Sequence, residues 1–500
     1  MIKRLLTLLC MQLAFCCTTF AANYLTFTAE EDSSAFSIED HNIKSNVFYS
    51  LDNGKTWNKL TDQPVKLAKG DRALLKGGKP DQTPSEENYS SFKMEGAIAA
   101  SGSVMSLVDG NGEGKTIPYD YCFYRLFQNC TSLTQAPKLP ATTLADCCYQ
   151  NMFSGCTSLT QAPELPATYL ADYCYTGMFS GCTSLTQAPK LPATYLADYC
   201  YTGMFSGCTS LTQAPKLPAT TLADNCYNGM FSACTSLTQA PELPATTLEK
   251  DCYEGMFSAC TSLTQAPELP ATTMEKGSYN WMFSECSSLT KAPELPATTL
   301  EERCYNGMFY MCNSLTQAPE LPATTLAGGC YGGMFRKCTS LTKAPNLPAT
   351  TLAERCYYEM FDDCTSLTQA PKLPATKLAD HCYNRMFYGC TSLTQAPELP
   401  ATTLAEKCYY GMFRGCTSLN KAPELPATTL AGKCYYGMFS GCSNLAYIKV
   451  AFTDWGTGTD FWLMGVAENG TFVCPAELSR NYGRNWIPVS WKIVNEDTSK

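Results

Sequence analysis

Cysteine recurs along most of this chain at a fixed interval of 26 residues. One series of thirteen cysteines runs from Cys130 to Cys442. A second series, eight residues ahead of it, runs from Cys122 to Cys434 with Ser278 at one position. Twelve full units therefore fill residues 130–441 without an insertion or a deletion. Because a unit of this length cannot bury an apolar face by itself, successive units must stack and share a core. The period predicts a solenoid.

Each unit combines a segment of helical spacing with an extended segment. In LADYCYTGMFSGCTSL the apolar residues from Leu170 to Leu185 follow one another at intervals of four, four, four and three, which is typical of one face of a short helix. The next segment, LTQAPEL, is strand-like until its proline, which has no N–H to donate to a ladder. We therefore expect the strand to break at Ala-Pro. We also expect Leu139, between Pro137 and Pro140, to be buried, which argues against a PxxP ligand.

The repeated MFSGCTSLTQAPELP resembles the leucine-rich repeats of BspA-like bacterial surface proteins over residues 121–450. The units here are longer than is usual in that family, and we place the extra residues at Ala-Pro and in ATTLAD. The resemblance implies an α/β leucine-rich-repeat solenoid with one short strand and one short helical turn per coil. It also implies attachment to host matrix proteins or to other cells.

Residues 1–21 have the features of an export signal. Lys3 and Arg4 precede an apolar stretch, and small residues favour cleavage between Ala21 and Ala22. No later stretch reaches eighteen uninterrupted apolar residues, so we expect no membrane span. The sequence predicts a bacterial protein that is exported to the cell surface or secreted.

The two ends of the chain lack the period. Residues 22–120 alternate like strands and predict a β-rich cap on the first coil, and residues 451–500 predict a small β cap on the last. Residues 50–57, SLDNGKTW, resemble the Asp-box of sialidases, which in that family is a structural hairpin away from the chemistry. A single copy does not predict a glycosidase.

The chain contains 30 cysteines, and three interpretations of them remain open. They are buried free thiols, disulfides within a unit such as Cys174–Cys182, or metal ligands. Serine at position 278 favours free thiols, because it replaces one cysteine while Cys286 remains. The spacing of eight residues does not match the short Cys-x-x-Cys pairs of zinc sites, and we expect no metal or other cofactor.

One position of the repeat changes while its neighbours stay constant. It lies between the first proline and the leucine of Ala-Pro-x-Leu-Pro and is nearly always charged, so we expect it to face solvent. Two interpretations stay open, a ligand-binding ribbon and a face that only maintains solubility. The candidate binding residues are Lys138, Glu164, Lys190, Lys216, Glu242, Glu268, Glu294, Glu320, Asn346, Lys372, Glu398 and Glu424.

We find no catalytic motif in the sequence. The chain has two histidines, His41 and His381, and no phosphate-binding glycine loop or nucleophile elbow. A net charge of −9 without a basic run argues against nucleic acid as a partner. The sequence predicts a non-enzymatic repeat scaffold for protein–protein or cell adhesion, with a glycan as another ligand to consider. The alternative is a carbohydrate-binding or carbohydrate-active surface protein whose activity lies in the end domains.

Overall fold

The computed structural model describes residues 23–496, so the predicted export signal and its cleavage site lie outside the described residues. The chain forms two compact units. The first unit holds the described residues up to Ala219 together with Ala233–Leu237, and the second holds Thr220–Ser232 and the described residues from Thr238 onward. Each unit is described by itself below.

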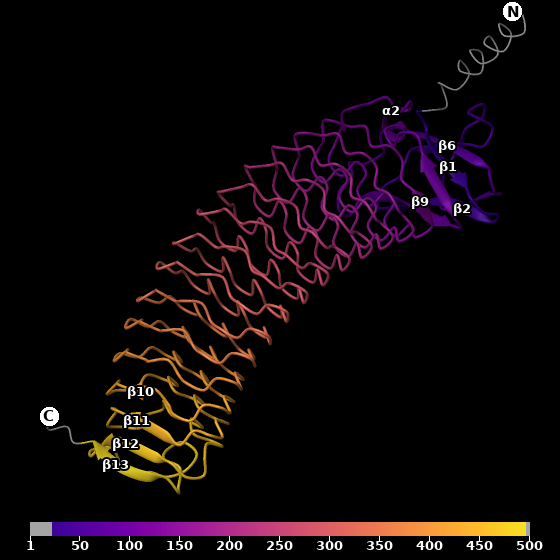
Figure 1. Cartoon of the computed structure of the whole chain (residues 1–500). Coiled ribbons are helices and arrows are strands. Elements are labelled where there is room, and N and C mark those ends of the chain that lie inside the picture. The colour runs from indigo at the N-terminus through magenta and orange to yellow at the C-terminus, as the bar shows by residue number, and fades with distance from the viewer. Residues whose placement is uncertain (1–22, 497–500) are drawn as a thin grey trace, which may run out of the picture. The chain divides into compact units, whose positions relative to one another are not determined.

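The first unit begins with two sheets (Figure 1). The six-stranded sheet has the order β4-β3-β6-β1-β8-β9, and the three-stranded sheet has the order β5-β2-β7. The strands are β1 (Leu25–Ala29), β2 (Ser34–His41), β3 (Val47–Ser50), β4 (Asn58–Lys59), β5 (Val65–Leu67), β6 (Arg72–Gly77), β7 (Tyr89–Glu95), β8 (Ile98–Ser101) and β9 (Leu133–Gln135). Helix α2 (Ser106–Asp109) is the only α-helix among residues 23–496.

The N-terminal sheets and the first coil share one core. Strand β9 belongs to the first coil and pairs in parallel with β8, whereas β1 is antiparallel to both β6 and β8. The ring of Phe92 lies 5.1 Å from that of Phe27 and 5.1 Å from that of Phe127 in the first coil. The apolar end of the first coil is therefore covered.

The helical turn that we expected in each coil is not present, and this part of the α/β prediction is wrong. The segment equivalent to residues 171–182, called the turn ribbon below, is a string of turns with a left-handed residue at every fourth position, as at Tyr173 (φ 56°), Gly177 (φ 59°) and Gly181 (φ 73°). A helix has no such residues in its interior. The spacing of four residues reflects this turn period rather than the 3.6 residues of a helix.

Hydrogen bonding alternates along the turn ribbon. The N–H of Met178 bonds within its own coil to Tyr175 O at 3.2 Å, whereas the N–H of Phe179 bonds to Met204 O of the next coil at 2.9 Å. The second unit repeats the pattern, since the N–H of Phe257 donates to Met282 O at 2.9 Å. Half of the backbone N–H groups therefore join successive coils along this segment.

The core consists of stacked columns of identical side chains. The Tyr, Met, Phe, Cys and Leu columns of the repeat are almost completely buried. In the first unit the rings of Phe153 and Phe179 lie 5.6 Å apart and nearly parallel, and in the second unit Phe257 and Phe283 lie 5.7 Å apart. The strict period thus superimposes each side chain on its own kind.

The proline segment is extended but forms almost no sheet. Within the first unit, parallel bridges occur at Gln161↔Gln187 and at Tyr169↔Tyr195, on either side of the prolines. Between them Leu165 is 3% exposed, whereas Glu164 and Pro166 are exposed. The predicted break at Ala-Pro and the burial of the leucine are both confirmed.

The second unit ends in a four-stranded parallel sheet. Its order is β10 (Glu424–Leu425), β11 (Tyr447–Val450), β12 (Thr471–Pro475) and β13 (Lys492–Glu496). Trp455, Trp462 and Phe472 are buried beneath it and pack against one another, with ring centroids 6.1 Å apart. No helix in residues 23–496 is long and apolar enough to cross a membrane.

Candidate functional site on the proline face

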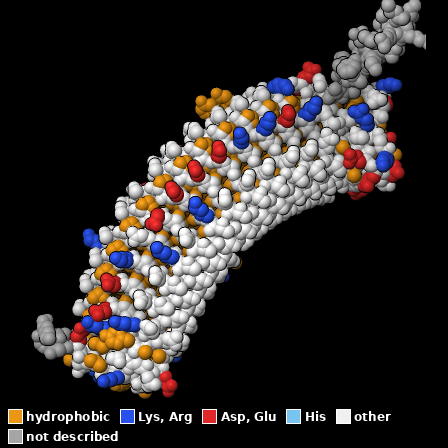
Figure 2. All heavy atoms as spheres, viewed as in Figure 1, with side chains coloured by type: hydrophobic (Ala, Val, Ile, Leu, Met, Phe, Trp, Pro, Cys, Tyr) orange, Lys and Arg blue, Asp and Glu red, His pale blue; other side chains and the backbone are white. Residues whose placement is uncertain are grey.

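The charged row consists of the twelve residues predicted above, from Lys138 to Glu424. All twelve side chains are exposed, and the leucine that follows each is buried. The extended backbone explains this, because successive side chains of such a segment point to opposite sides. Within each unit, Figure 2 shows charged side chains following one another along the visible face.

The sign of the charge differs between the two units. In the first unit the row has three lysines and one glutamate, namely Lys138, Glu164, Lys190 and Lys216. In the second unit it begins with four consecutive glutamates and then varies, through Glu242, Glu268, Glu294, Glu320, Asn346, Lys372, Glu398 and Glu424. The same backbone position thus presents a largely basic surface in one unit and a largely acidic one in the other.

Shallow grooves separate the proline segments of successive coils, and we call the row together with these grooves the proline face. In the first unit, residues 135–140, residues 161–164 and Pro166 line a groove of about 690 Å³. In the second unit, residues 291–296 and 317–320 line one of about 360 Å³, and residues 394–400 and 420–424 line one of about 680 Å³. Each groove brings two neighbouring members of the charged row together, such as Lys138 and Glu164.

The backbone of these grooves is left unpaired. Proline cannot donate to a ladder. Among the described coils, no backbone hydrogen bond joins the Pro-x-Leu-Pro segments of residues 163–166 to 397–400 to their neighbours within a unit. Their carbonyl oxygens and remaining N–H groups therefore lie beside the charged row without a protein partner. The proline face offers charge, proline rings and backbone hydrogen-bonding groups together.

Cys174 and Cys182, the pair for which a disulfide was considered, are both free thiols. The Cys182 thiol donates a hydrogen bond to Phe153 O of the preceding coil at 3.1 Å, and Cys286 bonds to Phe257 O in the same way. Burial raises the pKa of the Cys182 thiol to about 12. No three potential metal ligands cluster among residues 23–496. The thiols here are packing residues that also satisfy a buried carbonyl.

The two histidines lie in different units and in different settings. In the first unit His41 stacks on Tyr89 at 4.3 Å and lies 3.7 Å from the Glu39 carboxylate. In the second unit burial lowers the pKa of His381, whose Nδ1 lies 3.1 Å from the Asn384 amide. Neither histidine is next to a nucleophile in these contacts.

The Asp-box residues form a self-contained turn. Asp52 accepts hydrogen bonds from Thr56 N at 2.9 Å, from Thr56 Oγ1 at 2.6 Å and from Ser50 Oγ at 2.7 Å. These bonds, led by the one from the Thr56 hydroxyl, hold the pKa of the Asp52 carboxyl far below its usual range. Asp52 therefore organises its own hairpin.

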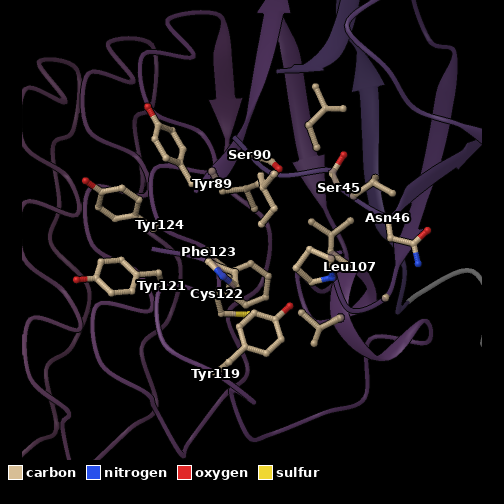
Figure 3. A pocket seen from close by; sticks show the side chains of 18 residues that line it. Ser45, Asn46, Tyr89, Ser90, Leu107, Tyr119, Tyr121, Cys122, Phe123 and Tyr124 are labelled. Carbon is tan, nitrogen blue, oxygen red and sulfur yellow. The ribbon is translucent and has the colours of Figure 1, made fainter. Parts of the chain in front are cut away.

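A small, partly open cavity lies between the N-terminal sheets and the first coil (Figure 3). Its volume is only about 70 Å³. Tyr119 and Cys122 lie next to each other at the cavity, and Tyr89, Tyr121 and Tyr124 lie along one side. This volume holds about two water molecules. It is too small for a sugar ring or for a segment of peptide.

The sequence analysis missed a pair of exposed tyrosine stacks in the first unit. Tyr169 and Tyr195 are 64% and 58% exposed with rings 4.9 Å apart, and Tyr173 lies 4.5 Å from Tyr199. Most other units have threonine where Tyr169 and Tyr195 stand. The signal was therefore present as a departure from the repeat in two adjacent units.

Comparison with known families identifies the repeats. A family model described as "BspA type Leucine rich repeat region (6 copies)" matches residues 119–238, 175–316, 228–368 and 331–453. Together these matches cover about two thirds of the chain. No curated protein and no solved structure matches it.

Proposed function

This chain belongs to the BspA-type leucine-rich-repeat family, and from that premise we propose that it is a non-enzymatic, exported bacterial surface protein whose repeats bind another protein in adhesion. Repeats of this kind generally serve as scaffolds for protein interaction. A solenoid with an identical backbone in every coil suits an extended contact better than it suits catalysis, which needs unlike groups at one point.

The observation that supports this proposal most is the structure of the proline face. Charged side chains recur there in every coil but that of Asn346, and unpaired backbone groups lie in the grooves between them. A partner that lies across several coils meets the same set of groups at each one. Individually weak contacts of this kind add up to a useful affinity when they are engaged together.

The charges indicate which partner surface each unit recognises. The four consecutive glutamates from Glu242 to Glu320 favour a basic surface, whereas the lysines of the first unit favour an acidic one. The partner is a protein, of the host matrix or of another cell surface, with patches of complementary charge.

The proposal is tested with the purified mature chain and a panel of immobilised extracellular-matrix proteins. Reversing Glu242, Glu268, Glu294 and Glu320 to lysine should weaken binding about tenfold or more, since each exposed ion pair contributes about 0.2–1 kcal/mol. Binding should also fall as salt rises. The matched control reverses four glutamates of the turn ribbon, Glu275, Glu285, Glu301 and Glu354, and should leave affinity within about twofold. A chain that binds no matrix protein, or a control that weakens binding equally, contradicts the proposal.

A further inference from the structure

One coil of the second unit departs from the repeat at two outward positions of the turn ribbon. Its sequence LAGGCYGGMF places Gly329 where the neighbouring coils have Arg303 and Arg355, and Gly332 where they have Asn306 and Tyr358. Two side-chain columns are therefore interrupted in the same coil. The result is a hollow of about 230 Å³, lined by these six residues and by Asn280 and Trp281.

The hollow exists because glycine stands at both positions. A Cβ atom at Gly332 would lie 2.6 Å from Asn306 Nδ2, so that amide occupies the space of the absent side chain. Asn306 Nδ2 also lies 3.4 Å from Gly329 O, to which it donates. One wall of the hollow is thus an amide held in place by the glycine backbone.

Two arginines stand one coil before and one coil after the glycines. The side chains of Arg303 and Arg355 are 60% and 58% exposed, and each Nε lies 3.6 Å from the carboxylate of the preceding glutamate. In the part of the chain that the structure describes, no side chain accepts a hydrogen bond from either guanidinium. Ion pairs this long and this exposed contribute little to stability, so the terminal nitrogens of both guanidinium groups are available to a ligand. A guanidinium binds a carboxylate or a similar anion through two parallel hydrogen bonds.

The remaining walls consist of a buried amide, Asn280, and two aromatic rings, Trp281 and Tyr358. Asn280 is 9% exposed; its Nδ2 donates to Glu254 Oε1 at 2.7 Å, whereas its Oδ1 has no hydrogen-bond partner. Trp281 is 38% exposed and is held edge-on against Tyr310 at 5.3 Å. Because this oxygen is buried, a ligand in the hollow does not reach it, and the exposed ring of Trp281 is the part of this wall that a ligand can contact.

We propose that this hollow binds the acidic sugar residue of a glycan. Arg303 and Arg355 hold its carboxylate or sulfate, and the rings of Trp281 and Tyr358 contact its C–H groups. The combination of anion donors and aromatic walls selects a sugar acid over a simple anion. The volume is that of a compact single-ring group rather than of a longer ligand. This site lies on the turn ribbon and is independent of the charged row.

The test measures binding of the mature chain to immobilised glucuronic acid and 6-sulfated N-acetylglucosamine, each beside its neutral parent sugar, glucose or N-acetylglucosamine. We expect saturable binding to at least one acidic probe and at least tenfold weaker binding to its parent. Binding of glucuronic acid would indicate a carboxylated ligand, and binding of the sulfated sugar would indicate a sulfated one.

Two variants remove the site in different ways. The double change Arg303→Gln and Arg355→Gln removes the anion donors, and Gly332→Tyr fills the hollow with the residue that position 358 already carries. Both should weaken binding at least tenfold. Lys407→Gln is the matched control, because Lys407 occupies the position of Arg303 in a coil where Tyr410 fills the column, and it should leave affinity within twofold. Thermal unfolding checks that each variant folds.

Three results would overturn this assignment. They are no binding to either acidic probe, equal binding to the neutral parents, and equal loss of binding in Lys407→Gln. A further measurement uses an oligoglutamate peptide as the probe. If this peptide binds as tightly as the acidic sugars, and Gly332→Tyr abolishes the binding of the peptide and of the sugars, the site is one for acidic peptides and the glycan proposal is wrong. The charge reversals of the proline face should not change sugar binding, so the two proposals fail separately.

Discussion

The two sides of a coil in this protein are joined to their neighbours in different ways. On the turn ribbon, every second N–H bonds to the next coil and the side chains beneath it are buried in stacked columns. On the proline face, grooves separate successive segments, and within each unit no backbone hydrogen bond of the described structure joins the Pro-x-Leu-Pro segments from 163–166 to 397–400. One side therefore holds the coils together, and the other is left available for contact with a partner.

This difference explains the pattern of constancy inside the repeat. The buried Tyr, Met, Phe and Cys positions scarcely vary from unit to unit, because each side chain is packed between copies of itself. Some outward positions on both sides do vary, among them the charged row on the proline face and positions 329 and 332 on the turn ribbon. The candidate site on the proline face arises from variation in the charge of the side chains. The hollow on the turn ribbon arises from variation in their size.

The largest expected effect comes from the thiols beneath the turn ribbon. Burial raises the pKa of Cys182, Cys286 and Cys338 from 9.0 to about 12. Because the folded state keeps these protons after the unfolded state has lost them, the stabilisation is complete below pH 9 and is lost as pH rises from 9 to 12. Three such thiols alone cost about 4 kcal/mol per pH unit in that window.

The measurement is the urea midpoint of unfolding at pH 7, 8, 9, 10 and 11 in the presence of a reducing agent. The midpoint should change little up to pH 8 and fall steeply above pH 9. A midpoint that stays level to pH 11 would show that the thiols are not buried in this way.

The next effect tests the stacked core in a single coil. Phe257 is completely buried between Phe231 and Phe283, with ring centroids 5.7 Å away on both sides. Replacing it with alanine leaves a cavity and removes both stacking contacts, so Phe257→Ala should lower the free energy of unfolding by about 3–5 kcal/mol. Urea denaturation measures the change, and Phe257→Leu should cost clearly less. A loss below about 1 kcal/mol would mean that the columns are not close-packed.

Much of this architecture could be predicted from the sequence, since a strict period identifies the buried and exposed columns. The exposure of Glu268 and the burial of Leu269 followed from comparing units within one chain. The helical turn was predicted wrongly, because apolar residues four apart match both a helix and a string of turns. The recurring glycines at positions 177 and 181 were the signal of left-handed residues there.

The candidate sites were predictable to different degrees. The charged row was visible as a varying position among constant ones. The grooves could not be predicted from the sequence. Proline has no N–H group, which predicts that hydrogen bonds are missing, but this does not predict that space is left between the segments. The hollow at Gly332 depends on side chains from three coils around the glycines of a fourth, and its sequence signal is only two extra glycines in one unit.

The smallest expected effect concerns an exposed residue of the proline face in the same coil as Phe257. Glu268 is exposed on the proline face, eleven residues after Phe257, and no hydrogen bond or ion pair in the described structure engages its side chain. Glu268→Ala should therefore change the free energy of unfolding by less than about 0.5 kcal/mol, as exposed substitutions away from structural contacts do. The same urea experiment compares it directly with Phe257→Ala. If Glu268→Ala destabilised the chain by more than about 1 kcal/mol, the proline face would contribute to coil stacking, and its availability to a partner would be in doubt.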